Sequence, residues 1–211
     1  MLNLEIFRIP VRVQGFFWLS AFLLGGGLSI RVMTDWISVL VFAGVLFFSV
    51  LVHELGHALA VRFLGGSPRI ILHALGGVTL LGQTPLTRWQ HLAIVAAGPM
   101  AGLLMGLISV ALLLWGRLPV EMALEYSAYI NIVWTLFNLL PVLPMDGGQM
   151  FRDLVGPRFE KLARVVGMIT AILVGVAAYQ YGFYIAAVLL GIMAWLNFKG
   201  SIQSGGVQRG H

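Results

Sequence analysis

The sequence predicts an all-α polytopic membrane protein with about six transmembrane helices and one small membrane-associated β-hairpin. Of the 211 residues, 59% are apolar and only 10% are charged, whereas a soluble domain carries about 25% charged residues. The apolar residues also occur in runs long enough to cross a hydrocarbon core of about 30 Å. These two properties exclude a soluble globular enzyme, a disordered chain and a fibrous protein.

Six apolar segments are expected to be membrane-spanning helices. The second is longer than about 20 residues, so we expect it to be tilted or to extend beyond the membrane. The fifth and sixth are separated only by Tyr181 and Gly182, which predicts a tight helical hairpin. The predicted spans are residues 15–30, 37–63, 91–115, 122–140, 162–180 and 183–198.

Segment 65–90, between the second and third spans, is not expected to be helical. Two short β-prone runs flank Gly76-Gly77, which predicts a small hairpin at the membrane surface or dipping into it. The tail 201–211 is polar and rich in glycine, so it is predicted to be flexible. We interpret residues 1–211 as one domain, in which 162–198 form the helical hairpin.

The basic residues are distributed unequally between the two sides of the membrane. With six spans both termini lie on one side, and eleven of the 13 Lys and Arg residues fall there. The positive-inside rule therefore predicts a multi-pass protein of the cell membrane, plasma or inner, with both termini cytoplasmic. Membrane topology explains the net charge of +5. We therefore expect the lipid bilayer as a partner, and we expect no nucleic acid. Arg31 and Arg117 lie on the opposite side, and the eleven are Arg8, Arg12, Arg62, Arg69, Arg88, Arg152, Arg158, Lys161, Arg164, Lys199 and Arg209.

Two carboxylates, Glu54 and Asp146, lie within or at the end of apolar segments. An ionisable side chain at membrane depth is costly and indicates a functional site. The chain contains no cysteine, so any metal must be held by His, Asp or Glu.

Glu54 belongs to the motif His53-Glu54-Leu55-Gly56-His57. On a helix, residues i and i+4 project from the same face, so His53 and His57 can bind one tetrahedral ion. Glu54 is rotated by about 100° from His53, where a carboxylate can take a proton from a metal-bound water and pass it to a leaving amine. The motif predicts two metal ligands and a general base.

Catalytic zinc usually keeps three protein ligands. The candidates for the third are Asp146, His73, His91 and Glu54 itself. Asp146 follows two prolines that end the fourth helix, and it lies at a depth similar to the histidine motif on the same side, so it is the predicted ligand. His73 and His91 lie in or beside the loop region, and we expect them to be hydrogen-bonded without binding metal.

Asn138 is the strong amide near the end of the fourth span, two turns before Asp146. We expect it either to hold an extended substrate or donate to a developing oxyanion, or to make a polar contact between helices.

Together these motifs resemble the site-2 protease family of intramembrane metalloproteases, in a minimal form without a PDZ or CBS domain. The resemblance implies one zinc ion per chain, bound by His53, His57 and Asp146, with Glu54 as general base. It also implies a catalytic core over about 37–150, cleavage of transmembrane segments, and a β element that pairs with an unwound substrate as an added strand. The motifs that carry it are His53–His57, Ala97-Gly98-Pro99 and Asn138, Pro141, Pro144, Asp146-Gly147-Gly148.

We therefore expect an intramembrane zinc metalloprotease that hydrolyses a peptide bond within or next to a transmembrane segment of a membrane-protein substrate, near the cytoplasmic face, as in regulated intramembrane proteolysis. One alternative is a metal transporter or sensor, although such proteins tend to show repeated halves and charges at several depths. The other is an inactive scaffold that binds transmembrane segments.

Overall fold

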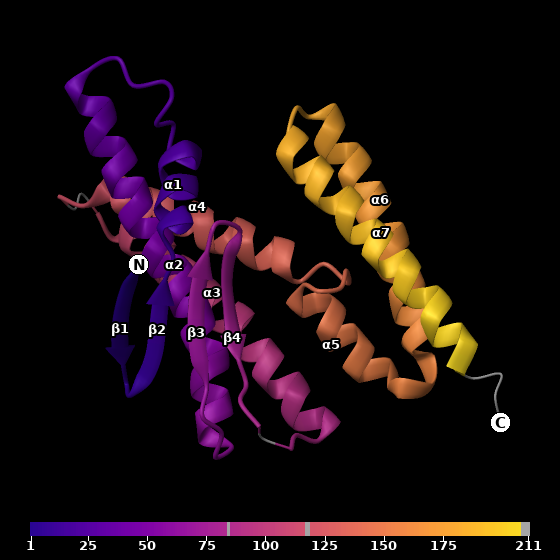
Figure 1. Ribbon diagram of the computed structural model, residues 1–211. Coiled ribbons are helices and arrows are strands. Elements are labelled where there is room, and N and C mark those ends of the chain that lie inside the picture. The colour runs from indigo at the N-terminus through magenta and orange to yellow at the C-terminus, as the bar shows by residue number, and fades with distance from the viewer. Residues whose placement is uncertain (84, 117–118, 208–211) are drawn as a thin grey trace. The chain divides into compact units, whose positions relative to one another are not determined.

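The computed structural model describes residues 1–83, 85–116 and 119–207 (Figure 1). The chain divides into two compact units, the first made of Met1–Pro85 and Ala97–Thr135 and the second of Leu86–Ala96 and Leu136–His211. The boundaries fall inside two helices, because α3 covers Arg88–Trp115 and α4 covers Glu121–Asn138. The interpretation of the whole chain as one domain stays a prediction.

The first unit contains a four-stranded sheet of β1 (Leu2–Ile6), β2 (Ile9–Val13), β3 (Arg69–His73) and β4 (Gly76–Leu80). The strands lie in the order β1-β2-β3-β4 (Figure 1). β3 and β4 form the predicted hairpin, which is confirmed, and β2 runs parallel to β3. The prediction was incomplete, because the hairpin is half of a sheet whose other half comes from the N-terminus.

The β1–β2 hairpin carries no usual turn signal. Its turn residues Phe7 and Arg8 have φ angles of 51° and 59°, whereas two-residue hairpin turns of this kind favour Asn-Gly or Gly-Gly. Arg62, near the end of a helix from Met33 to Phe63, donates a hydrogen bond to the carbonyl oxygen of Phe7. A long-range contact therefore supports a turn that the local sequence does not indicate.

The core of the first unit lies between β2, β3 and two helices, α1 (Gly15–Leu24) and α2 (Met33–Phe63). Alternate residues of β2 are buried while Pro10 and Arg12 are exposed, as expected for a strand with one face against a core. The buried members of this core are Ile9, Val11, Val13, Phe17, Ala21, Leu46, Val50, Leu51, Ala58, Ile70, Leu72 and Ile130. Strand β4 also lies beside α2.

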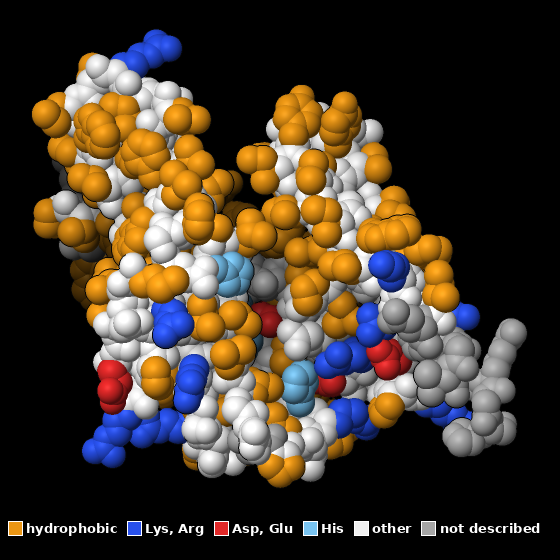
Figure 2. Space-filling view, in the orientation of Figure 1, with side chains coloured by type: hydrophobic (Ala, Val, Ile, Leu, Met, Phe, Trp, Pro, Cys, Tyr) orange, Lys and Arg blue, Asp and Glu red, His pale blue; other side chains and the backbone are white. Residues whose placement is uncertain are grey.

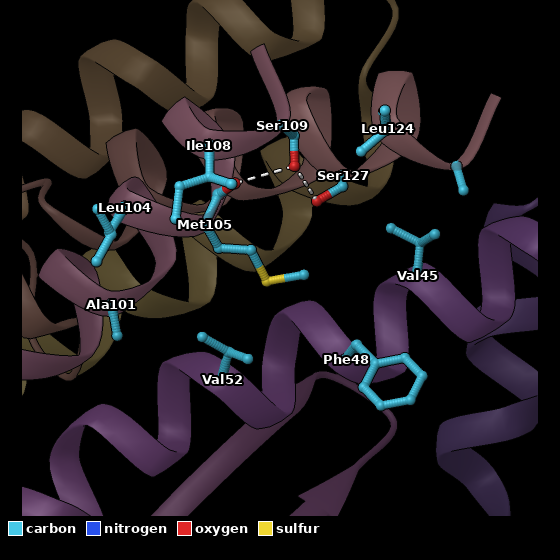
Figure 3. Close-up of a pocket in the computed structure, with 11 residues that line it drawn as sticks. Val45, Phe48, Val52, Ala101, Leu104, Met105, Ile108, Ser109, Leu124 and Ser127 are labelled. Carbon is cyan, nitrogen blue, oxygen red and sulfur yellow. Dashed lines mark hydrogen bonds between the residues drawn. The ribbon is translucent and has the colours of Figure 1, made fainter. Parts of the chain in front are cut away.

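Polar side chains join α2, α3 and α4 inside the same unit. Asn131 donates hydrogen bonds of 2.8 Å to Ser49 Oγ and to the Ser127 carbonyl oxygen. Ser109 donates a bond of 2.8 Å to Ser127 Oγ. The two serines form the polar wall of an otherwise apolar pocket of about 550 Å³, shown in Figure 3, between α2, α3 and α4.

The second unit contains α5 (Asp146–Val155), the 3-10 helix η1 (Pro157–Phe159), α6 (Glu160–Gln180) and α7 (Tyr184–Val207). α6 and α7 form the predicted hairpin (Figure 1), and Gly182 in its turn has a φ of 81°. The segment before α5 packs on this hairpin through Val142 and Met145. Asn197 of α7 donates a hydrogen bond of 2.7 Å to the Leu143 carbonyl oxygen. Helix α5 itself was not predicted.

In the described part of the chain, four helical segments are long and apolar enough to cross a membrane: Met33–Phe63, Arg88–Trp115, Pro157–Gln180 and Tyr184–Ile202. Hydrophobic side chains cover much of the exposed surface of α6 and α7 (Figure 2). The prediction of six spans is not confirmed. Helix α1 ends at Leu24, before a run of three glycines in which Gly26 has a φ of 86°, so the first span through residue 30 is wrong. Helix α4 carries Glu121 and Glu125, which lower its hydropathy.

The tail prediction is also corrected in part. Ser201 and Ile202 continue α7, which extends to Val207, because the segment contains no proline and follows a strong apolar helix. Residues 208–211 lie outside the described part of the chain, as do Arg117 and Arg209, which entered the prediction of topology.

We predict that Gly56→Ala lowers the free energy of unfolding by about 1–3 kcal/mol. A Cβ at Gly56 would lie 2.4 Å from the Ala97 carbonyl oxygen, so α2 and α3 would have to separate. Thermal unfolding of the purified protein in detergent measures the effect. Gly44→Ala in the same helix is the control, because nothing lies within 4 Å of its added Cβ, and it should be neutral or stabilising by about 0.5–1 kcal/mol. Equal effects of the two changes would contradict the packing argument.

Candidate metal centre

His53 and His57 project from one face of α2 and are almost fully buried, with 3% and 8% of their surfaces exposed. Their Nε2 atoms lie 3.3 Å apart, and their rings are nearly perpendicular, at 81°. Two nitrogens bound tetrahedrally to zinc at about 2.0–2.1 Å are about 3.3–3.4 Å apart. The spacing of the two imidazoles therefore fits a shared zinc ion.

Glu54 lies next to the first histidine and is 5% exposed. Thr79 of β4 donates a hydrogen bond of 2.7 Å to Glu54 Oε2, and its hydroxyl also lies 3.1 Å from the Glu54 carbonyl oxygen. The carboxylate therefore has a defined hydrogen-bond partner on the sheet.

Helix α3 approaches both histidines through glycines. A Cβ at Gly98 would lie 2.1 Å from His57 Nε2. A Cβ at Gly102 would lie 3.1 Å from Thr135 Oγ1 and 3.7 Å from His53 Nδ1. Small residues at these positions let the α3 backbone lie directly against the two imidazoles.

Asp146 belongs to the second unit, where it is the first residue of α5 and is 9% exposed. A Cβ at Gly147 would lie 2.1 Å from the Leu139 carbonyl oxygen, and one at Gly148 would lie 2.4 Å from the Val142 carbonyl carbon. The glycine pair thus allows the first turn of α5 to pack on the backbone of the segment before it. This close packing fixes the position of Asp146 within its unit.

The other histidines considered as ligands have different partners. His91 Nδ1 lies 2.5 Å from Asp153 Oδ2 at the other end of α5. His73 Nδ1 accepts a hydrogen bond of 3.3 Å from the Leu75 N–H in the β3–β4 turn. Both histidines are therefore hydrogen-bonded, as expected.

The predicted ligands are three buried side chains, the imidazoles of His53 and His57 in the first unit and the carboxylate of Asp146 in the second. Two imidazoles and one carboxylate are a donor set that zinc accepts in catalytic sites. His53, Glu54 and His57 lie together in the first unit, and Asp146 lies in the second. Asn138 is the half-buried last residue of α4.

Sequence reasoning missed two polar residues of the first unit: one that contacts Glu54, and one that lies near the glycine of α3 that faces His53. Thr79 was passed over because a threonine in a β-prone run usually reflects strand propensity. Asn131 was detectable, since a carboxamide within an apolar helix needs a partner. Its amide oxygen lies 3.8 Å from the Cβ position of Gly102, close to Thr135 and His53.

Comparisons with known proteins point in one direction. The model of the family described as peptidase family M50 matches residues 41–118 and 115–181. A candidate zinc metalloprotease of Synechocystis sp. is 37% identical over 125 residues, which cover 58% of this chain and 33% of that protein. The candidate zinc metalloprotease Rip3 of Mycobacterium tuberculosis is 32% identical over 166 residues, which cover 71% of this chain and 42% of that protein. The chain thus spans less than half the length of these curated relatives.

A solved structure has the same fold. The site-2 protease from Methanocaldococcus jannaschii superposes with a TM-score of 0.65 at 24% identity, over 95% of this chain and 94% of that one. The resemblance noted in the motifs therefore holds for the fold as well.

We predict that Gly98→Ala lowers zinc affinity by about 10- to 100-fold, because the new methyl group would displace the His57 ring. Zinc content after dialysis against buffers of graded free zinc measures the change. Gly191→Ala, where nothing lies within 4 Å of the added Cβ, is the control and should bind zinc as the unmodified chain does. Unchanged zinc affinity in Gly98→Ala would contradict the close contact between α3 and a zinc-binding His57 ring.

Proposed function

The chain belongs to peptidase family M50, and from this we propose that it is a zinc-dependent intramembrane protease. The reaction is hydrolysis of a peptide bond within or next to a transmembrane segment of another membrane protein. The observation that carries the proposal is the 3.3 Å separation between the Nε2 atoms of His53 and His57. Glu54, which lies between these two residues in the sequence, is also buried. These three side chains lie inside a helix that is long and apolar enough to span a membrane.

We propose Asp146 as the third zinc ligand. Catalytic zinc usually has three protein ligands, and Asp146 is a buried carboxylate that follows α4 by eight residues of chain. Two prolines, Pro141 and Pro144, give a backbone that is irregular before α5. Membrane proteins tolerate such backbone where it is enclosed by protein or lines a wet cavity.

The chain's own residues would carry the proton transfers. A zinc ion held by this ligand set would polarise the scissile carbonyl group and make a water molecule more acidic. Glu54 accepts a proton from the attacking water as the water oxygen bonds to the carbonyl carbon. The same carboxyl group then donates that proton to the amide nitrogen as the carbon–nitrogen bond breaks.

Strand β4 suits an unwound substrate. Among the described strands it pairs with β3 alone, so its second edge can accept an added strand. Its contact with α2 brings that edge close to Glu54. Helical substrate carbonyls are hydrogen-bonded and shielded, so pairing with β4 would hold the segment extended. Asn138 is proposed to hold the substrate backbone.

The orientation of the protein is a further part of the proposal. The excess of Lys and Arg on one side of the predicted spans supports a multi-pass cell-membrane protein with cytoplasmic termini. Cleavage near the cytoplasmic face follows, because the His-Glu motif lies in the last turns of α2, close to Arg62.

We expect one zinc ion per chain in detergent-purified protein and in Glu54→Gln, and little or none in His57→Ala and Asp146→Ala. Glu54→Gln should lose cleavage, since a carboxamide cannot take up the proton. Metal analysis measures zinc content. Mass spectrometry of a single-span test protein with helix-breaking residues in its span detects cleavage.

The outcomes separate the alternatives. Cleavage by Glu54→Gln would overturn the assignment of the general base. Zinc binding without cleavage by the unmodified chain, together with zinc transport into vesicles, would favour a transporter. A folded chain without zinc would indicate an inactive scaffold that binds transmembrane segments.

A further inference from the structure

We propose that Thr79 of β4 is a positioning residue for the Glu54 carboxylate. The inference rests on the proposed function, because it assigns to Thr79 the task of holding the general base in its working orientation. It adds to that function a link between the strand that would receive the substrate and the group that would move the proton.

The hydrogen bond between the two side chains is direct. Thr79 Oγ1 lies 2.7 Å from Glu54 Oε2, which is a short distance typical of a hydroxyl that donates to a carboxylate. The hydroxyl also lies 3.1 Å from the carbonyl oxygen of Glu54. Since a hydroxyl has one proton, donation to Oε2 gives the stronger, charge-assisted bond.

The backbone of β4 constrains the other side of the carboxylate. A Cβ at Gly77 would lie 2.7 Å from Glu54 Oε1 and 2.5 Å from Glu54 Cγ. Gly77 and Thr79 are two residues apart, so they face the same side of the strand. Strand β4 therefore contacts Oε2 through a hydroxyl and lies against Oε1 with bare backbone.

This arrangement limits how the carboxylate can turn. The terminal torsion of glutamate is broad and roughly two-fold, so an unrestrained Glu54 would sample many orientations. Fixing Oε2 on Thr79 leaves Oε1 as the oxygen available for proton transfer. A proton acceptor must lie within hydrogen-bond reach of its donor, so holding it there raises kcat without a new contact to the substrate.

The test compares Thr79→Val and Thr79→Ser in the full chain purified in detergent, with the single-span test protein as substrate. We expect Thr79→Val to lower kcat by about 10- to 100-fold, with KM and zinc content unchanged. Thr79→Ser keeps the hydroxyl and should retain kcat within about threefold. Thr170→Val in α6 is the matched control and should leave all three quantities unchanged.

Gly77→Ala provides an independent variant. The added methyl group should push the carboxylate aside and lower kcat while zinc remains bound. An unchanged kcat in Thr79→Val would overturn the proposal. Equal losses in Thr79→Val and Thr79→Ser, or a loss of zinc in Thr79→Val, would also overturn it in favour of a structural role.

A double-mutant cycle on thermal stability tests the contact even if the chain proves to have no protease activity. Thr79→Val should lower the melting temperature of the unmodified chain and have no such effect in a Glu54→Ala background, because the partner is already absent. Additive effects would show that the hydrogen bond does not form, and would overturn the proposal. The Glu54→Gln result given above decides the proposed function separately.

Discussion

The constraint on which the first unit depends is the burial of two imidazoles and a carboxylate within about one turn of an apolar helix. Such groups need polar partners at close range, because a surrounding lipid phase offers none. The backbones of α3 and β4 come close to these groups because glycine, which has no side chain, occupies the points of approach. Gly98 lets α3 lie against His57, and Gly77 lets β4 lie against Glu54. Glycine at these positions is explained by what each backbone must approach, and not by helix or strand preference, which glycine weakens.

Polar side chains of α4 also satisfy buried groups, at a greater distance from the His53–His57 motif. Asn131 is buried, and its amide donates hydrogen bonds to Ser49 of α2 and to Ser127 of its own helix. Its oxygen and the Thr135 hydroxyl both lie around the position that a side chain at Gly102 would fill, as does His53 Nδ1. A polar network of this kind fixes the rotation of α2 relative to α4, because each helix would otherwise leave a buried group unsatisfied. The orientation of a histidine ligand is normally set by such neighbours.

Sequence reasoning reached what local chemistry determines and missed what long-range contacts determine. The pairing of His53 with His57, the β3–β4 hairpin and the α6–α7 hairpin each depend on residues close together in the chain. The N-terminal strands do not: their turn uses Phe7 and Arg8 in left-handed conformations, supported by Arg62. Helix α5 was not predicted, because Asp146-Gly147-Gly148 suggests a turn. In the structure, these glycines let the first turn of the helix pack on residues 139–143. The length of the first predicted span was too great, because the sequence remains mostly apolar beyond Leu24 although the helix ends there, before three glycines.

The register of β4 determines which of its residues face Glu54. Side chains alternate along a strand, so Gly77 and Thr79 face Glu54 while Val78 and Leu80 are exposed on the other side. A substrate added to the free edge of β4 would pair through backbone groups, which every residue possesses. Recognition of this kind selects for a segment that can unwind and become extended, and it sets little requirement on side chains. The position of the cut would then follow from how far the extended segment reaches along β4, with Thr79 and Glu54 marking the point at which the peptide bond is exposed to hydrolysis.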